Sequence, residues 1–343
     1  MENFSSYHSD KAMTYEDGLI LITALRYFKE TNDEYFKDFI IKYYDHAVLE
    51  DGSIRGFNLA DYNIDNILSG CLLKEVYEYT HKEKYLKTIE LLKKQLATHP
   101  RTNSGSFWHK LRYPYQIWLD GLYMGQLFHL KYNKDLEDSF HQFLNARKFL
   151  FNEENHLYYH AYDETKTMQW ADKITGRSPN VWSRSVGWWL MGLVDCYSFF
   201  NDEQKPVIAG LFVETVEGLI PHLHPVYKML YQIVDKPELV GNYLETSGSC
   251  MLAYSLLKAV SLHIIDEKYY NLAKEIVKGI DRAYLKFNGT NYLLGGICKV
   301  AGLDNDVRNG SVKYYLSEPI IANEVKGLAP YLMAYLELIK HER

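Results

Sequence analysis

The sequence predicts an all-α fold built from helical hairpins, and three observations support this prediction. Apolar residues recur every three to four positions through most of the 343 residues, as they do on the buried face of a helix. Strand-like runs are short and few, and they do not alternate regularly with the helical segments. The helical segments form pairs separated by short polar or glycine-bearing connections, roughly one pair every 50–60 residues. Six such pairs would account for the length of the chain.

In chain order, the helical pattern is clearest in the segments 18–30, 34–48, 84–99, 120–132, 185–200, 246–264 and 325–341. The clearest strand-like run is NYLLGGICKV at 291–300. No linker is visible, because the chain has only nine prolines, no Ser/Gly-rich run and no block of like charge. We therefore expect a single domain of stacked hairpins over residues 1–343, as an open solenoid or a closed toroid. The lack of a tetratricopeptide-like or ankyrin-like repeat weakens the solenoid interpretation.

Composition and charge exclude several functional classes. Lysine and arginine are spread along the chain, whose formal net charge is −6, so no nucleic-acid partner is expected. No segment approaches about 18 uninterrupted apolar residues, so no contact with a membrane is expected. The N-terminal stretch MENFSSYHSDKAMTYEDG lacks a basic start followed by an apolar run. That pattern predicts no signal peptide and a cytoplasmic location.

Cysteine and aromatic content add two further expectations. The four cysteines form no CxxC motif and lie far apart, so reduced, mostly buried thiols are expected; they are Cys71, Cys196, Cys250 and Cys298. Aromatic residues make up 15% of the chain, including 30 tyrosines. Flat rings with a polar tip suit the recognition of sugars, but they suit helix packing equally well.

The stretch YPYQIWLDGLYMGQLFHL at 113–130 places one carboxylate, Asp120, among aromatic and aliphatic side chains. A buried charge is costly unless it is paired or neutralised. One interpretation is that Asp120 lies at the start of a helix and points to water. The other is that an apolar setting keeps the carboxyl group protonated near neutral pH, as a general acid requires.

A second carboxylate, Asp65, lies in DYNIDNILSG at 61–70, just before an apolar run. A helix cap explains an acid at this position about as well as a catalytic role does. Close to Asp120 in sequence stand His109, Lys110 and Trp118. Two carboxylates, each at a helix entrance, are what a glycoside-cleaving site needs.

Two further clusters lie between predicted helices. His156 and His160 are four residues apart, but no third ligand stands at a suitable offset, so a metal site is not expected. The segment SPNVWSRSVGWW at 178–189 contains Trp182, Arg184 and Trp188. Tryptophans can stack on a sugar ring, and an arginine can hold a carboxylate with two hydrogen bonds. The adjacent Trp189 is expected to belong to the helix core.

Together these motifs resemble a known family. The blocks YNIDNILSG, YPYQIWLDGLYM, WADKITGRSPNVWSRSVGW, NYLETSGS and YYLSEPII are similar to those of the unsaturated rhamnogalacturonyl hydrolases, glycoside hydrolase family 105. They also resemble the unsaturated glucuronyl hydrolases of family 88. The similarity runs from about residue 15 to 335 and implies an (α/α)6 toroid of six helical hairpins.

The resemblance assigns roles to particular residues. Asp120 matches the catalytic acid and base of the family, and Asp65 matches its second acidic residue. The positions that match substrate-binding residues are Tyr15, His109, Lys110, Trp118, Met124, His160, Trp182, Arg184 and Trp188. The sequence departs from the family pattern at Ser183, within WSRSVGW, and at Glu324, within NEVKG. Ser183 lies between two of these positions, so a change in how the leaving sugar is held is expected.

The family chemistry implies a substrate made by a lyase, an oligosaccharide that ends in a uronic acid with a C4=C5 double bond. Asp120 would protonate C4 and then help to deprotonate the water that adds at C5. No metal and no organic cofactor is expected. The partner is a small oligosaccharide of the rhamnogalacturonan type, and the chain is expected to act as a monomer or homodimer.

Three alternatives remain open at this stage. A conventional inverting glycosidase on the same toroid would use Asp65 and Asp120 with a water between them. A sugar 2-epimerase would need a histidine pair, for which His109 and His160 are the candidates. An α-solenoid scaffold without activity would instead expose a concave groove for a peptide.

Overall fold

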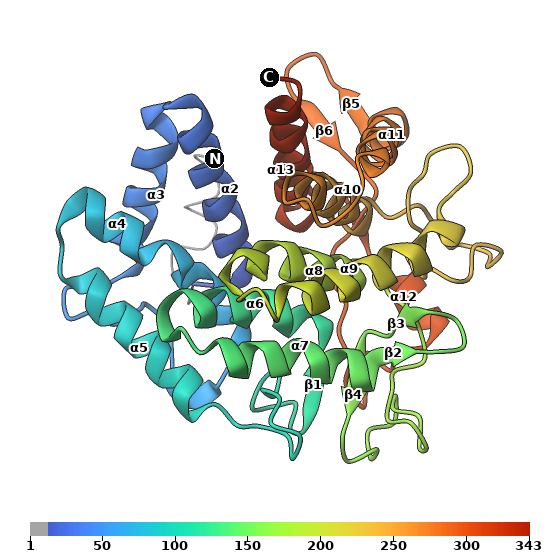
Figure 1. Ribbon diagram of the computed structural model, residues 1–343, viewed down its shortest axis with the longest axis horizontal. Helices are drawn as coiled ribbons and strands as arrows, with labels where there is room; N and C mark the ends of the chain where they lie inside the picture. Colours follow the sequence, from blue (N-terminus) through green and yellow to red (C-terminus); the bar gives the residue numbers. More distant parts are fainter. Residues whose placement is uncertain (1–12) are drawn as a thin grey trace.

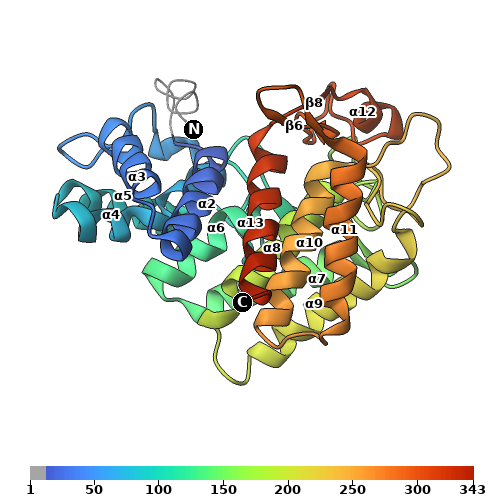
Figure 2. The ribbon, with the colours of Figure 1, turned by 90° about the horizontal axis from the view of Figure 1, so that it is seen from above.

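The computed structural model describes residues 13–343, and helices dominate it (Figure 1). Within that range, helical segments alternate between an inner ring and an outer layer. The inner segments are α2 (Tyr15–Thr31), η3 (Leu68–Leu72) with α4 (Leu73–Thr80), α6 (Leu119–Phe128), α8 (Ser183–Cys196), α10 (Thr246–Ser261) and α13 (Val325–His341). Each inner segment packs against the next, and α13 packs against α2 (Figure 2). The ring is therefore closed, and the predicted (α/α)6 toroid is confirmed.

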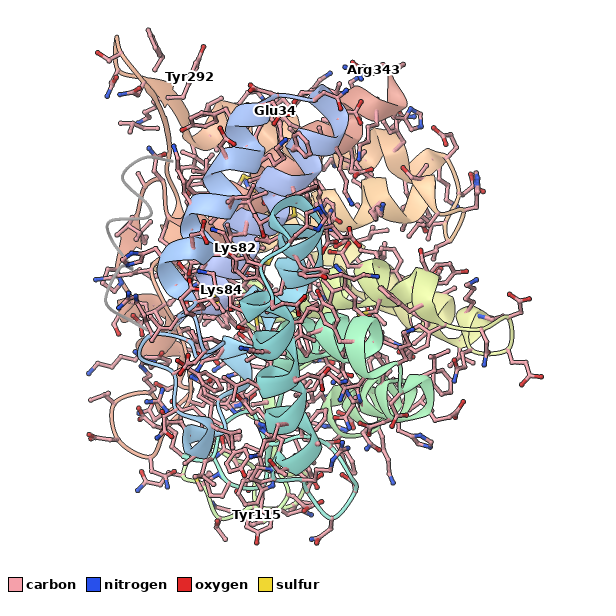
Figure 3. All side chains as sticks on the ribbon, turned by 90° about the vertical axis from the view of Figure 1, so that its left-hand side faces the viewer. Glu34, Lys82, Lys84, Tyr115, Tyr292 and Arg343 are labelled. Carbon is pink, nitrogen blue, oxygen red and sulfur yellow. The ribbon has the colours of Figure 1, made fainter. Side chains whose placement is uncertain are left out.

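The outer layer consists of longer amphipathic helices: α3 (Glu34–Ala47), α5 (Lys84–Thr98), α7 (Leu136–Leu150), α9 (Lys205–Leu219) and α11 (Lys268–Tyr284). These helices bury one face and expose charged residues on the other. Asp45 of α3, for example, pairs with Lys82 and Lys84 at the start of α5, at 2.7 and 3.1 Å, and both lysines are labelled in Figure 3. Inner helices such as α8 and α10 are instead buried on nearly every side.

Close packing in the inner ring depends on small residues. A Cβ atom at Gly248 of α10 would lie 2.7 Å from the carbonyl carbon of Ser183, at the start of α8. Any side chain at this position would push the two helices apart, because the neighbouring atoms are backbone and cannot rotate away. The two helix starts therefore meet at a fixed separation.

The strands are short, and each pair joins two segments that lie outside the helices. They pair antiparallel: β1 (Gln116–Trp118) with β4 (Ala161–Asp163), β2 (Phe151–Asn152) with β3 (Leu157–Tyr158), β5 (Leu285–Phe287) with β6 (Tyr292–Leu294), and β7 (Ile297–Cys298) with β8 (Ile320–Ile321). The remaining segments are 3-10 turns η1 (Leu59–Asp61), η2 (Ile64–Asn66), η5 (Tyr197–Phe199) and η6 (Ile220–His222), the π-turn η4 (His129–Asn133) and the short helix α12 (Val312–Ser317).

Most predicted elements are confirmed, with differences at their ends. The segment 120–132 is helical only as far as Phe128 and then widens into the π-turn η4. The run 291–300 is two short strands, β6 and β7, separated by a turn. Trp189 lies in the core as predicted, and its indole N–H donates to Thr215 Oγ1 at 2.9 Å.

The four cysteines are free thiols and all are buried, as predicted. None of the helices between residues 13 and 343 has the length and apolar character needed to cross a membrane. Residues 1–12, which carry most of the stretch used for the signal-peptide prediction, lie outside the described part of the chain.

Candidate active site

The N-terminal ends of the inner segments meet at one end of the toroid. Each of the first five inner segments is followed by an outer helix that leads back to the next, so successive inner segments run in the same direction. Contacts between their first turns confirm this. Lys326 of α13 forms an ion pair with Glu16 of α2, and Arg184 of α8 donates to Ser247 Oγ of α10 at 3.3 Å. Helix N-termini carry partial positive charge, so this end of the ring favours an anionic ligand.

Asp120 lies in the first turn of α6, next to His160. The pair of strands β1 and β4 places them together, because β1 runs directly into α6 and His160 immediately precedes β4. His160 Nε2 lies 3.3 Å from Asp120 Oδ2. The Asp120 side chain is 14% exposed, and its Oδ2 is buried without a hydrogen-bond partner. The carboxyl group is thus mostly enclosed, and no lysine or arginine forms an ion pair with it in the described residues.

Asp65 has a different environment. It lies in the 3-10 turn η2, whose cap is the Asn63 side chain, so the interpretation of Asp65 as a cap is wrong. Its carboxylate accepts a hydrogen bond from Lys110 Nζ, and His109 Nε2 lies 3.6 Å from Oδ1. Lys110 reaches Asp65 because the loop that carries it pairs with Asn63 through a β-bridge.

The charges around Asp65 give this carboxyl group a defined state. Burial raises the pKa of Asp65, but Lys110, His109 and Arg112 lower it more strongly, so the pKa lies below its ordinary value. Asp65 is therefore an anion at neutral pH. Burial lowers the pKa of His109 to about 4, against the opposing effects of Asp65 and Asp120, so His109 is a neutral imidazole.

Aromatic rings enclose the two carboxyl groups. The Trp118 ring is nearly parallel to those of His109 and Tyr113, with centroids 4.6 and 4.9 Å away. Trp118 also meets His160 edge to face at 5.1 Å, and the Trp182 ring lies 4.8 Å from His160 on another side. The predicted residues His109, Trp118, His160 and Trp182 therefore form one continuous group next to Asp120.

Arg184 extends this group toward α10. It is 1% exposed, and its guanidinium lies over the Trp182 ring at 4.9 Å. Nη1 donates to the Cys298 carbonyl at 2.7 Å and to Ser247 Oγ, whereas Nε and Nη2 have no partner among the described residues. Burial lowers the pKa of Arg184, but Cys298, Glu245 and Glu324 raise it more, so the group stays charged. Nε and Nη2 lie along one edge of the guanidinium, which matches the two oxygens of a carboxylate.

Of the remaining predicted residues, Tyr15 lies close to Asp65, whereas Trp188 and Met124 lie in the hydrophobic core. Burial, Glu16 and Asp65 raise the pKa of Tyr15 well above its usual range, so Tyr15 is a neutral phenol close to Asp65. Its ring meets Trp188 edge to face at 5.9 Å, and Trp188 stacks on Tyr123 at 5.4 Å. Trp188 and Met124 are 1% exposed and belong to the main core. Binding roles for these two residues stay predictions.

Two buried or partly buried acids at helix starts support this group. Glu245 is fully buried and caps α10 by accepting from the Gly248 N–H at 2.7 Å; it also accepts from the Ser247 hydroxyl and the Cys298 N–H. Glu324 likewise caps α13 and pairs with Lys326. Both caps are local contacts, whereas the bond from the Cys298 N–H to Glu245 and the ion pair of Lys326 with Glu16 join segments far apart in the chain.

Ser183 and Tyr315 make two further contacts with residues of this group. Ser183 is fully buried and its hydroxyl donates to Glu245 at 3.3 Å. It therefore packs between α8 and α10, and its effect on how a leaving sugar is held stays a prediction. Tyr315 of α12 places its hydroxyl 2.7 Å from His160 Nδ1. The motif YYLSEPII contains Tyr315, but nothing in the sequence indicates which side chain it contacts.

No metal centre coincides with the site in the described residues. His156 is exposed on the turn between β2 and β3, away from the buried His160. One group, His129, Asp135 and Asp138, brings ligand atoms close together elsewhere. Asp138 is already paired there with Arg101 at 2.6 Å and with His129 at 2.9 Å, which explains the cluster as an ion-pair network.

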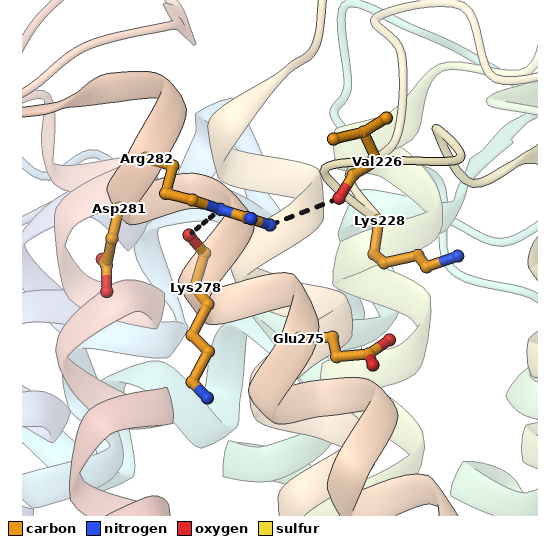
Figure 4. A pocket seen from close by; sticks show the side chains of 6 residues that line it. All are labelled: Val226, Lys228, Glu275, Lys278, Asp281 and Arg282. Carbon is orange, nitrogen blue, oxygen red and sulfur yellow. Dashed lines mark hydrogen bonds between the residues drawn. The ribbon is translucent and has the colours of Figure 1, made fainter.

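The described residues form a small, more enclosed hollow of about 10 Å³, lined in part by His109 and Trp118, and two larger open hollows. One of about 280 Å³ is next to the carboxylate group and is lined by Asp61, Asn63, Lys110, Leu111 and Arg112. It opens beside the loop whose Tyr115 is labelled at the lower end of the molecule in Figure 3. The other, of about 490 Å³, lies on the outer side of α11 between Lys228, Lys278 and Arg282 (Figure 4). Of these two, only the first has a side chain in common with the candidate site.

Comparison with known proteins gives consistent matches. The family model described as Glycosyl Hydrolase Family 88 matches residues 1–342. A solved structure of a family 105 glycoside hydrolase from C. acetobutylicum ATCC 824 is 41% identical, with a TM-score of 0.93 over 97% of this chain and 95% of that chain.

Two curated proteins are more distant. Protein Atu3128 of Agrobacterium fabrum is 32% identical over 238 residues, which cover 62% of this chain and 97% of that protein. The unsaturated rhamnogalacturonyl hydrolase YesR of Bacillus subtilis is 24% identical over 274 residues, which cover 75% of this chain and 74% of that protein. The resemblance stated from the motifs is confirmed.

Proposed function

The chain belongs to glycosyl hydrolase family 88, and on this premise we propose that it hydrates the C4=C5 double bond of an unsaturated uronic acid at the non-reducing end of a lyase product. The substrate is a short rhamnogalacturonan fragment, in keeping with the name of the relative from B. subtilis. The reaction consumes one water and releases the next sugar. The observation that carries this proposal is the contrast between the two carboxyl groups.

Asp120 and Asp65 suit different roles. Asp65 is held as an anion by Lys110, and both of its oxygens face positively polarised groups, so it is poorly placed to donate a proton. The Asp120 oxygen Oδ2 is buried and lacks a hydrogen bond. No lysine or arginine pairs with Asp120 in the described residues, so its carboxyl group is free to exchange a proton with substrate, as a general acid and base must. We assign proton transfer to Asp120 and an electrostatic and binding role to Asp65.

The chemistry follows from these assignments. Asp120 donates its proton to C4, and positive charge develops at C5 and the ring oxygen. Water adds at C5 and gives its proton to the Asp120 carboxylate, which restores the acid. The product is a hemiketal at C5, and its ring opens to a ketone. Ring opening leaves the former ring oxygen as a hydroxyl on C1, which also carries the glycosidic oxygen and is therefore a hemiacetal. This hemiacetal collapses to an aldehyde and releases the neighbouring sugar. The Asp65 anion stabilises the positive charge of the intermediate.

Arg184 suits the substrate carboxylate. Its free edge of Nε and Nη2 is buried and offers two charged donors in one plane. A charge-assisted pair of this geometry holds a planar carboxylate in a single orientation. The nearby N-termini of the inner helices favour the same negative charge.

The test is the ultraviolet absorbance of the conjugated double bond. We expect the unsaturated galacturonyl-rhamnose disaccharide to lose this absorbance with the wild-type protein. The Asp120→Asn variant should be slower by about two to four orders of magnitude, the range for losing a proton-transfer group. The conservative change of an exposed acid, Asp202→Asn, is the matched control and should leave the rate unchanged. Near-normal turnover by Asp120→Asn would remove Asp120 from the mechanism.

The same assay separates the alternatives. A conventional inverting glycosidase would release the leaving sugar while the absorbance stays constant. A 2-epimerase would depend on His109 and His160 and would tolerate Asp120→Asn. The His109 ring is parallel to that of Trp118 and lies next to Asp65, whereas the His160 ring meets Trp118 edge to face and lies next to Asp120, so each histidine is placed beside a different carboxyl group.

A further inference from the structure

His160 lies between two side chains that the chain supplies from distant positions. Its Nδ1 is 2.7 Å from the hydroxyl of Tyr315, and its Nε2 is 3.3 Å from Asp120 Oδ2. His160 and Tyr315 are both 0% exposed. The three residues therefore form a continuous chain from α12 through the loop before β4 to the first turn of α6.

The hydrogen of the Tyr315 hydroxyl has only one acceptor among the described residues. Burial raises the pKa of Tyr315 well above its usual range, so the group is a neutral phenol with one O–H. Its oxygen contacts no hydrogen-bond partner other than His160 Nδ1 in that part of the chain. If Nδ1 carried a hydrogen, the phenol hydrogen would be buried without an acceptor. Donation from Tyr315 to Nδ1 satisfies both groups.

That donation determines the other side of the imidazole. When Nδ1 is the acceptor, a neutral imidazole carries its hydrogen on Nε2. Nε2 then faces Asp120 Oδ2, and neither atom has another partner within residues 13–343. The 3.3 Å separation is within hydrogen-bond range but the two groups are not aligned for a hydrogen bond, and such bonds commonly tighten when substrate binds.

We propose that Tyr315 is a positioning residue that holds neutral His160 as the Nε2–H tautomer, so that the imidazole anchors Oδ2 of Asp120 and leaves Oδ1 to exchange the proton with substrate. This inference rests on the proposed function and deepens it. A neutral imidazole matters here, because an imidazolium would stabilise the ionised carboxylate and oppose a general acid. The other groups around His160 are the rings of Trp118 and Trp182, with His109 as a further electrostatic neighbour.

The first test reads the tautomer directly in the wild-type protein. Nitrogen-15 spectra of histidine-labelled protein distinguish a protonated from an unprotonated ring nitrogen, and the His160 signals are assigned by their loss in His160→Gln. We expect Nε2 to be protonated and Nδ1 to be an acceptor. A signal for protonated Nδ1 would overturn the proposal, whatever the activity of the protein.

The second test is kinetic. Tyr315→Phe should lower kcat about tenfold, as expected for losing one hydrogen bond, with little change in KM. It should also give a mixture of His160 tautomers. The control is Tyr314→Phe, which removes the adjacent hydroxyl that accepts from the Gly302 N–H at 2.9 Å and does not contact His160. Tyr314→Phe should keep wild-type kinetics and the Nε2–H signal.

These outcomes separate the inference from the proposed function. If the wild-type protein leaves the double bond intact, the proposed function fails, and the tautomer measurement still decides the geometry. If the wild-type protein is active and Tyr315→Phe matches Tyr314→Phe in both kcat and tautomer, Tyr315 positions nothing. If Tyr315→Phe does not fold, the wild-type spectrum decides alone.

Discussion

Replacing Arg184 by lysine provides a direct test of how the site holds a uronate. Nη1 of Arg184 already binds the Cys298 carbonyl and Ser247, so only Nε and Nη2 are free for substrate. A lysine has one ammonium and cannot present two donors along one edge. We therefore expect the variant to lose at least one of two charged hydrogen bonds to the substrate carboxylate.

The expected fall in kcat/KM follows from the loss of one charged hydrogen bond. A hydrogen bond to a charged group contributes about 1.5–3 kcal/mol. Because each 1.4 kcal/mol is a factor of ten, kcat/KM should fall by about 10- to 150-fold. Most of the change should be in KM, since the carboxylate is bound in the ground state as well as in the transition state.

The assay compares two substrates in a double-mutant cycle. One is the unsaturated disaccharide with a free carboxylate, and the other is its methyl ester, which cannot form the charged pair. The wild-type protein should prefer the acid strongly, and Arg184→Lys should reduce that preference to within a few-fold. Arg282→Lys on α11, whose guanidinium donates only to main-chain oxygens outside the site, is the control and should keep the wild-type preference.

Thermal unfolding of Arg184→Lys tests whether the loss of activity comes from a destabilised fold, because Arg184 is buried at the start of α8. An equal fall in kcat/KM for acid and ester would refute the reasoning. Arg184 would then support the fold without recognising the carboxylate.

Four further predictions concern charge and packing. Asp65→Asn should lower kcat severely, because it removes the anion beside the site; a change in KM alone would make Asp65 a binding residue only. Lys110→Met should move the acid limb of the pH–rate profile to higher pH, since burial then raises the pKa of Asp65 without its strongest opposing charge. The stability advantage of the wild type over Lys110→Met should be complete above the raised pKa of Asp65 in the variant and should narrow as the pH falls through that pKa, which Tm measurements would show. Burial lowers the pKa of His99 to about 4, so wild-type stability should fall as the pH drops from about 6.5 toward 4, and His99→Gln should flatten that part of the curve; an unchanged curve would contradict this. Gly248→Ala should cost about 1–3 kcal/mol, because its Cβ would meet the Ser183 backbone at 2.7 Å, and a Tm equal to wild type would contradict the packing argument.

The amino-acid sequence was sufficient for the helices and for the two carboxylates. Apolar spacing indicated the buried faces of the inner and outer helices, because that spacing is local and follows from 3.6 residues per turn. Asp120 stands out in the sequence because it is a lone acid within an apolar run. The outer helices α7, α9 and α11 were not among the segments singled out from the sequence.

The partners of those carboxylates depended on the tertiary structure. Local sequence could not show that Lys110 holds Asp65, that His160 faces Asp120, or that Tyr315 contacts His160 across 155 positions of chain. These contacts form only when the ring closes and the inner helix starts meet at one end. Sequence alone therefore indicated the two candidate carboxylates, and the closed ring decided that Asp65 pairs with Lys110 whereas Asp120 lies beside His160 with no lysine or arginine partner in the described residues. The physical reason is that helix periodicity is encoded within a few neighbouring residues, whereas the burial and pairing of a charge depend on residues distant in the chain.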